Sequence, residues 1–98
     1  MTPATAERVG DILRIQGELN FDSVAELWAT TRTSLQAEPF LRIDLSGVRH
    51  ADSAGVALLV EWLRLARSHR HELVFTNIPE QMQAIIRVVD LETTLPVA

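Results

Sequence analysis

The chain has 98 residues, of which 22% are charged and 47% are apolar. This length and apolar fraction predict one small globular domain over residues 1–98 and exclude intrinsic disorder. Because the chain has no cysteine, a disulfide scaffold and a thiolate metal site are excluded. All nine basic residues are arginine, and the formal net charge is −4. A chain this acidic, without a basic stripe, is a poor candidate for binding nucleic acid or anionic lipid.

The start of the chain predicts a β-hairpin. Residues 1–6 are expected to form a loose N-terminal segment. Two short strands, at residues 7–9 and 12–15, follow it, and the Gly-Asp pair between them is a turn signal. Gly17 is expected to end the second strand.

The next stretch predicts a helix and then a strand. Ser23 opens the helix, and Glu26 three residues later completes a capping-box pattern. Pro39 stops the helix, and residues 40–45 alternate as a strand. The apolar side chains of the helix share one face: Val24, Leu27, Trp28, Thr31 and Leu35.

The second half of the chain predicts a loop, a long helix, a strand and a last helix. The loop is the polar stretch 46–52, and the long helix runs from Ala54 to Arg70. The strand covers residues 73–76, and Pro79 suits the first turn of the last helix. The long helix has a wide apolar face, made of Leu58, Leu59, Trp62, Leu63, Leu65 and Ala66, and the last helix has Ile78, Met82, Ile85, Ile86 and Val89 at helical spacing.

The order of these elements defines an α/β fold class. After the hairpin, strands and helices alternate, and each strand–helix–strand unit favours a parallel, right-handed crossover. The expected architecture is a small mixed, largely parallel sheet with helices packed mainly on one face.

Neither a targeting segment nor a membrane span is predicted. The first residues lack a charged region followed by an apolar stretch, and the longest near-continuous apolar run is only Ala54–Val60. We therefore expect a cytoplasmic protein that reaches a membrane only through another protein.

The sequence offers little for catalysis, and we expect neither an enzyme nor a cofactor. A phosphate-binding loop is excluded by the absence of lysine. His50 is a conceivable base for Ser53, but no third group that would orient it is recognisable. His69 and His71 lack a third metal ligand and suit the negative end of a helix, so no metal site is expected.

The junction before the long helix carries the main functional signal. Either Asp52 or Ser53 can serve as its N-cap. A hydroxyl at Ser53 lies in the positive field of the helix N-terminus, and phosphorylation there would add about −1.5 to −2 charges beside Asp52. The site is therefore a candidate switch for a docking surface.

The long helix itself offers such a surface. At 100° per residue, Ala57 and Val60 fall within the polar arc set by Glu61, Arg64 and Arg67. They are interpreted either as an apolar centre with a charged rim or as isolated surface residues of no special role.

Three motifs at these spacings together resemble the STAS domain family: Gly17-Glu18-Leu19-Asn20, Ile43-Asp44-Leu45-Ser46 and Asp52-Ser53-Ala54-Gly55. The resemblance covers residues 10–95, and the predicted order of elements is also that of the family. The family includes anti-sigma-factor antagonists and the cytoplasmic tails of sulfate transporters. Within it, the likeness is greatest to the small stand-alone STAS subunit of phospholipid (Mla-type) ABC transporters, and it is carried by Leu27-Trp28, the run Gly55–Val60 and Leu95-Pro96.

This resemblance implies a binding module without enzymatic activity. Such a subunit binds the transporter's cytoplasmic ATPase subunit, and through it the permease, and supports assembly and activity. The complex moves phospholipid between the inner and outer membranes of Gram-negative bacteria and maintains outer-membrane lipid asymmetry. The expected partner-binding and switch residues are Asp52, Ser53, Ala54, Gly55, Ala57, Val60, Glu61, Arg64 and Arg67.

The resemblance also implies an alternative, an anti-sigma-factor antagonist whose partner is a kinase. In that case Ser53, which matches the family's phosphorylatable residue, would be the phosphosite. Asn20 stands where antagonists usually have aspartate, and Ala54 where they usually have a second serine. Both departures favour the transporter subunit.

Overall fold

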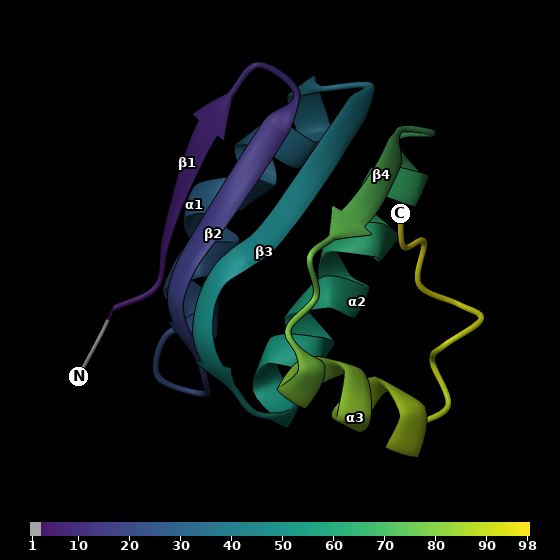
Figure 1. Ribbon diagram of the computed structural model, residues 1–98. Helices are drawn as coiled ribbons and strands as arrows, with labels where there is room; N and C mark the ends of the chain where they lie inside the picture. The colour runs from purple at the N-terminus through teal and green to yellow at the C-terminus, as the bar shows by residue number, and fades with distance from the viewer. Residues whose placement is uncertain (1–2) are drawn as a thin grey trace.

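The computed structural model describes residues 3–98 (Figure 1). Their helices and strands follow the predicted order: β1 Thr5–Val9, β2 Ile12–Leu19, α1 Val24–Ala37, β3 Phe40–Ala51, α2 Ser53–Ser68, β4 Glu72–Thr76 and α3 Glu80–Val88. Strands β1 to β4 form one sheet in chain order. Strand β1 is antiparallel to β2, and the β2–β3 and β3–β4 pairs are parallel. The predicted hairpin and the mixed, largely parallel sheet are confirmed.

The N-terminal segment is more ordered than expected. Thr5 and Ala6 belong to β1, where they pair with Gln16 and Ile15 of β2. Ala4 packs against the core. The predicted loose segment 1–6 is therefore wrong for its last residues, and Met1 and Thr2 lie outside the described residues.

Strand β2 does not end at Gly17, as predicted, but continues through it to Leu19. Gly17 has φ +101°, a conformation that side chains disfavour, and a Cβ there would lie 2.2 Å from the carbonyl oxygen of Pro3. The glycine therefore permits a close approach of the N-terminal segment without interrupting the strand.

Strand β3 also runs further than predicted, to Ala51, and takes in nearly all of the expected loop 46–52. Two register shifts against β2 each place one extra residue in β3. The buried positions consequently change spacing after Leu45, from every second residue to Val48 and then Ala51. The strict alternation that predicts a strand therefore stops at Leu45, although the strand itself continues.

Helix α1 buries its predicted face through Leu27, Thr31 and Leu35. The predicted capping box is wrong: no side-chain cap is formed, and the Ser23 hydroxyl instead donates to the carbonyl oxygen of Glu18 at 2.7 Å. The other helices also depart from expectation in detail. Helix α2 ends at Ser68, before the predicted Arg70, and Val89, expected on the buried face of the last helix, is 50% exposed.

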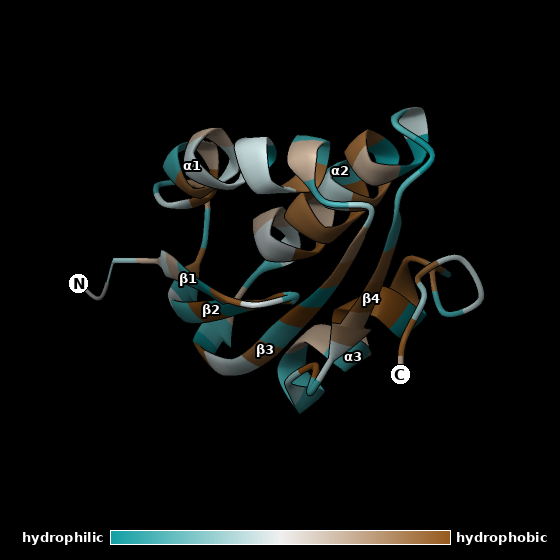
Figure 2. Ribbon diagram, turned by 90° about the horizontal axis from the view of Figure 1, so that it is seen from above, coloured by the Kyte–Doolittle hydropathy of each residue, from teal (hydrophilic) through white to brown (hydrophobic). Residues whose placement is uncertain are grey.

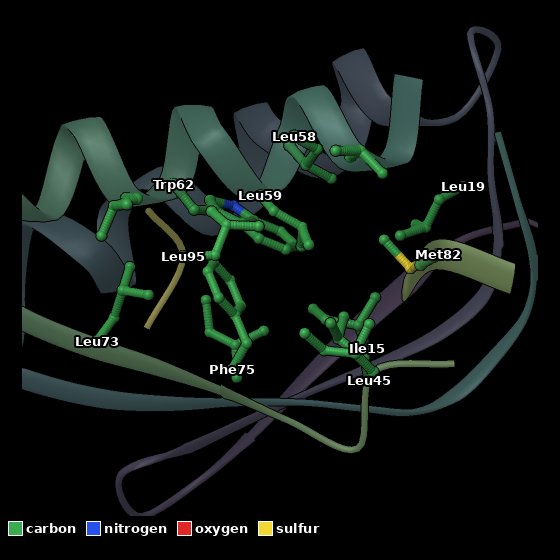
Figure 3. Packing of buried hydrophobic residues seen from close by; sticks show 14 of the residues in the cluster. Ile15, Leu19, Leu45, Leu58, Leu59, Trp62, Leu73, Phe75, Met82 and Leu95 are labelled. Carbon is green, nitrogen blue, oxygen red and sulfur yellow. The ribbon is translucent and has the colours of Figure 1, made fainter. Parts of the chain in front are cut away.

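Helices α1 and α2 lie side by side over one face of the sheet, as predicted (Figure 2). Helix α3 packs against α2 and β3, near the turn that joins these two elements (Figure 1). The core between the layers contains Trp62 of α2, Phe75 of β4 and Met82 of α3, each fully buried (Figure 3).

Candidate partner-binding site

The junction of β3 and α2 is held by Asp52, which is the N-cap of the helix. Its Oδ1 accepts a hydrogen bond from the backbone N–H of Ala54 at 2.8 Å. Its backbone N–H donates to the carbonyl oxygen of Leu19 at 3.1 Å, which ties the junction to the end of β2. Of the two residues that the sequence allowed as N-cap, the structure selects Asp52.

Ser53 is the first residue of α2 and its side chain is exposed. Within residues 3–98 no hydrogen bond engages its hydroxyl. This oxygen lies at the positive end of a helix of 16 residues. The Ser53 hydroxyl is thus exposed at the start of the helix and makes no hydrogen bond within the described residues.

Ala54 and Gly55 lie beneath this surface. Both are buried, and a Cβ added to Gly55 would lie 2.9 Å from Cβ of Leu19 and 3.2 Å from Cβ of Ala51. The absence of a side chain at Gly55 allows α2 to start directly on the ends of β2 and β3.

The helical residues expected at the surface divide into two groups. Ala57, Glu61, Arg64 and Arg67 are exposed, and Arg64 Nη1 lies 3.3 Å from Glu61 Oε1 in an ion pair. Val60 is only half-buried and packs against the core cluster. Of the two residues predicted to form the apolar centre, Ala57 is exposed and Val60 is partly covered.

A groove between α1 and α2, which we call the α1–α2 groove, begins beside this junction. It has a volume of about 280 Å³. Phe21, in the turn before α1, is 77% exposed at its edge. The groove is lined almost entirely by apolar side chains: Phe21, Val24, Ala25, Trp28, Ala54, Ala57 and Leu58, with Glu61 as the charged member.

No motif in the sequence indicates Phe21 as a site residue, and Trp28 falls on the apolar face of its predicted helix. The available signal was a large aromatic residue inside the polar stretch 20–23. The turn that presents it is fixed by Asn20, whose Oδ1 accepts from the backbone N–H groups of Asp22 and Ser23 at 2.9 and 3.1 Å. An asparagine here supplies the same acceptor oxygen that an aspartate would.

Of the three histidines, His50 lies at the end of β3 beside the junction, and His69 and His71 follow the far end of α2. His50 Nδ1 lies 3.3 Å from Nε2 of Gln81, and no hydrogen bond joins it to Ser53 within the described residues. His69 and His71 have ring centroids 5.7 Å apart. Residues 3–98 contain no cluster of three or more His, Cys, Asp or Glu residues that could hold a metal ion. Nor does this part of the chain contain a helix long and apolar enough to cross a bilayer.

Comparison with known proteins gives consistent matches. The family model described as "Mlab, STAS domain" matches residues 4–97. The intermembrane phospholipid transport system binding protein MlaB of Escherichia coli (strain K12) is 26% identical over 84 residues, which are 86% of this chain and 84% of that protein. A chain of the Acinetobacter MlaFEDB complex, in its ATP-bound Vtrans2 conformation, is 25% identical with a TM-score of 0.82 and covers 96% of this chain and 99% of its own.

An anti-sigma factor antagonist from Mycobacterium paratuberculosis is 18% identical, with a TM-score of 0.80 over 99% of this chain and 85% of its own. At this identity the likeness shows the fold alone. The family model, in contrast, spans the described chain from the residue before β1 to the penultimate residue. The mixed sheet and the two covering helices are accordingly those of a STAS domain, and the chain belongs to the MlaB STAS domain family.

Proposed function

We propose that this chain is the STAS subunit of a phospholipid (Mla-type) ABC transporter, and that it binds the transporter's ATPase subunit without catalysing a reaction itself. The similarity to MlaB and to a chain of the MlaFEDB complex supports this proposal. In this role the protein is peripheral to the inner membrane and reaches the permease only through the ATPase. It supports assembly and activity of a complex that maintains outer-membrane lipid asymmetry.

The observation that carries the proposal is an exposed apolar groove directly beside an unengaged hydroxyl. Aromatic side chains in the centre of a contact surface contribute much of the binding energy in protein complexes. The α1–α2 groove offers Trp28 and the exposed Phe21 for this purpose. The exposed pair of Glu61 and Arg64 forms a charged rim that would steer and orient a partner.

A second candidate function, an anti-sigma-factor antagonist, is favoured by one observation, the accessible Ser53 hydroxyl. In that role phosphorylation of Ser53 would control binding to a kinase. Mass spectrometry of the protein from its native host separates the two functions. Stoichiometric phosphate on Ser53 would favour the antagonist, and an unmodified chain in a transporter complex would favour the transporter subunit.

The first test is affinity purification of the tagged chain from a native-host membrane extract, with identification of the proteins that co-purify. We expect recovery of an ABC ATPase together with its permease. Recovery of a soluble kinase of the anti-sigma type, with neither transporter subunit, would contradict the proposed function.

A substitution series then tests the surface. Ser53→Glu is expected to weaken binding to the ATPase subunit by at least about tenfold, because an unpaired charge would be buried at the contact. Ser53→Ala removes only a hydroxyl and is expected to change affinity less. Titration calorimetry with the purified ATPase subunit measures both.

Thr33→Glu provides the control for the added charge. Thr33 is an exposed residue of α1 that does not line the α1–α2 groove. If Ser53→Glu binds as tightly as the Thr33→Glu control, the junction is not part of the contact surface.

A further inference from the structure

Helix α3 contacts the β3–α2 junction through the side chain of Gln81. Its Oε1 accepts a hydrogen bond from the backbone N–H of Ala51 at 3.1 Å. Its Nε2 lies 3.3 Å from Nδ1 of His50. One glutamine in the first turn of α3 therefore contacts the last two residues of β3, which are thirty positions away along the chain.

The hydrogen bond from Ala51 to Gln81 lies on the side of β3 that β4 no longer covers. Strand β4 pairs with β3 only up to Asp44, where it ends at Thr76. The rest of β3 pairs with β2 alone, and Ala51 at its end is 2% exposed. A buried backbone N–H without an acceptor is costly, so the amide oxygen of Gln81 takes the place that a β4 carbonyl would have occupied.

Gln81 is itself held in place by the core. The next residue, Met82, is completely buried and lies in the core cluster on the side of Leu19 (Figure 3). Ile86, one turn further along α3, is also buried. The Gln81 side chain is thus supported by a helix that cannot move away without exposing Met82.

We propose that Gln81 is a positioning residue for the partner-binding site. Ala51 is the last residue of β3. It is followed directly by Asp52, the N-cap of α2, and by Ser53, the first residue of that helix. By holding that amide, Gln81 fixes the direction in which Ser53 faces relative to the α1–α2 groove. Helix α3 contributes no residue to the lining of that groove, and the hydrogen bond of Gln81 connects it to the junction beside the groove. The proposal rests on the proposed function for its binding readout.

Two substitutions at Gln81 and one control test this inference. Gln81→Leu keeps the side-chain bulk and removes the acceptor, whereas Gln81→Glu keeps an acceptor oxygen for Ala51. Gln83→Leu is the matched control, because Gln83 is an exposed glutamine of the same helix whose Nε2 donates to the carbonyl oxygen of Ile78 at 2.8 Å, away from the junction. Circular dichroism first verifies that all variants are fully folded at the temperature used.

Two measurements are then made on the full chain. Amide hydrogen exchange followed by NMR is expected to be at least about fivefold faster at Ala51 in Gln81→Leu than in Gln83→Leu, since only the first variant loses the acceptor. Affinity for the purified ATPase subunit is expected to fall about five- to tenfold in Gln81→Leu, to stay within about twofold in Gln83→Leu, and to recover in Gln81→Glu.

The two readouts separate the inference from the proposed function. Equal affinities of Gln81→Leu and Gln83→Leu for the ATPase subunit would overturn the positioning role, and so would equal exchange at Ala51. A wild-type chain that does not bind the ATPase subunit at all would overturn the proposed function, and the exchange at Ala51 would then decide the positioning role alone.

Discussion

Asp44 connects three parts of the sheet. Its Oδ1 accepts from the side-chain amide of Asn77 and from the backbone N–H of Ser46, each at 3.0 Å, and its Oδ2 lies 3.7 Å from Nε of Arg14. The hydrogen bond from Asn77 is the largest of several causes that hold the pKa of Asp44 below its usual value of 3.8. The charged carboxylate is therefore favoured in the folded state.

This shift predicts a pH dependence of stability. Because the pKa of Asp44 is lower in the folded chain than in the unfolded one, its contribution to stability is present above about pH 3.8 and is lost as the pH falls below that value. Asp44→Asn removes the titrating group, so its free energy of unfolding is expected to fall less steeply than that of the wild type between pH 5 and pH 3. Urea unfolding at several pH values measures both slopes.

Asp22→Asn is a suitable control, because Asp22 is an exposed carboxylate next to the turn that Asn20 fixes. The predicted role of Asp44 is wrong if the two variants show the same pH slope.

The candidate site shows how far single residues can be predicted from sequence. Spacing alone indicated that Asp52 and Ser53 start a helix, but both have oxygens that can cap it, so only the fold decides between them. Phe21 precedes the first helix and lies outside its periodic pattern, and its exposure depends on the turn held by Asn20. Gln81 could not be found, because its partner Ala51 is distant in sequence and offers only a backbone group.

At the scale of elements, a buried hydrogen bond joins the two covering helices. The indole Nε1 of Trp62 in α2 donates to Oγ1 of Thr31 in α1 at 2.8 Å, and both residues are buried. The same hydroxyl donates to the carbonyl oxygen of Leu27 at 2.8 Å. Thr31 is thus a polar group in the core that is fully paired.

Thr31→Val is expected to lower the free energy of unfolding by about 1–3 kcal/mol, because the buried indole N–H loses its acceptor while the side-chain shape is kept. Thr30→Val controls for the lost hydroxyl, since exposed Thr30 also donates to the carbonyl oxygen of Leu27, at 3.0 Å, whereas the indole of Trp62 donates to Thr31. Urea denaturation followed by circular dichroism compares them. Equal stabilities of the two variants would contradict this role.

Element types and their order were predictable here, but the start of β1 and the ends of β2 and β3 were not. The apolar periods of the three helices were long enough to reveal them despite errors at their boundaries. The predicted β2 ended too early because glycine is a common turn signal. In the structure the positive φ of Gly17 and its lack of a side chain instead allow Pro3 to lie close to the strand. Strand β3 was cut short because two register shifts break its alternation, and such shifts arise from pairing with β2.

At the scale of the whole molecule, the C-terminal segment covers the open edge of β4. The backbone N–H of Phe75 donates to the carbonyl oxygen of Pro96 at 2.8 Å, and that of Ala98 donates to the carbonyl oxygen of Phe75 at 3.0 Å. Leu95 is 5% exposed and joins the core cluster. An edge strand with free backbone groups invites pairing with other chains, and this segment blocks it.

Leu95→Ala is expected to lower the free energy of unfolding by about 2–5 kcal/mol, through lost burial and a cavity beneath the segment. Exchange of the Phe75 amide should also become faster, because its acceptor is released with the segment. Val97→Ala, at a position 57% exposed, serves as the control for shortening a side chain in this segment. If Leu95→Ala leaves both the free energy of unfolding and the exchange of the Phe75 amide unchanged, Leu95 does not hold the C-terminal segment on the edge of β4.

The two tryptophans lie in different environments, so their intrinsic fluorescence can report on two different events. The chain contains two tryptophans and no tyrosine, so apart from the weak emission of phenylalanine its fluorescence comes from these indoles. Trp62 is completely buried and senses the loss of the core, whereas Trp28 lines the α1–α2 groove and senses what enters it. With phenylalanine in place of one indole at a time, fluorescence would report unfolding and docking as separate signals, without any attached dye.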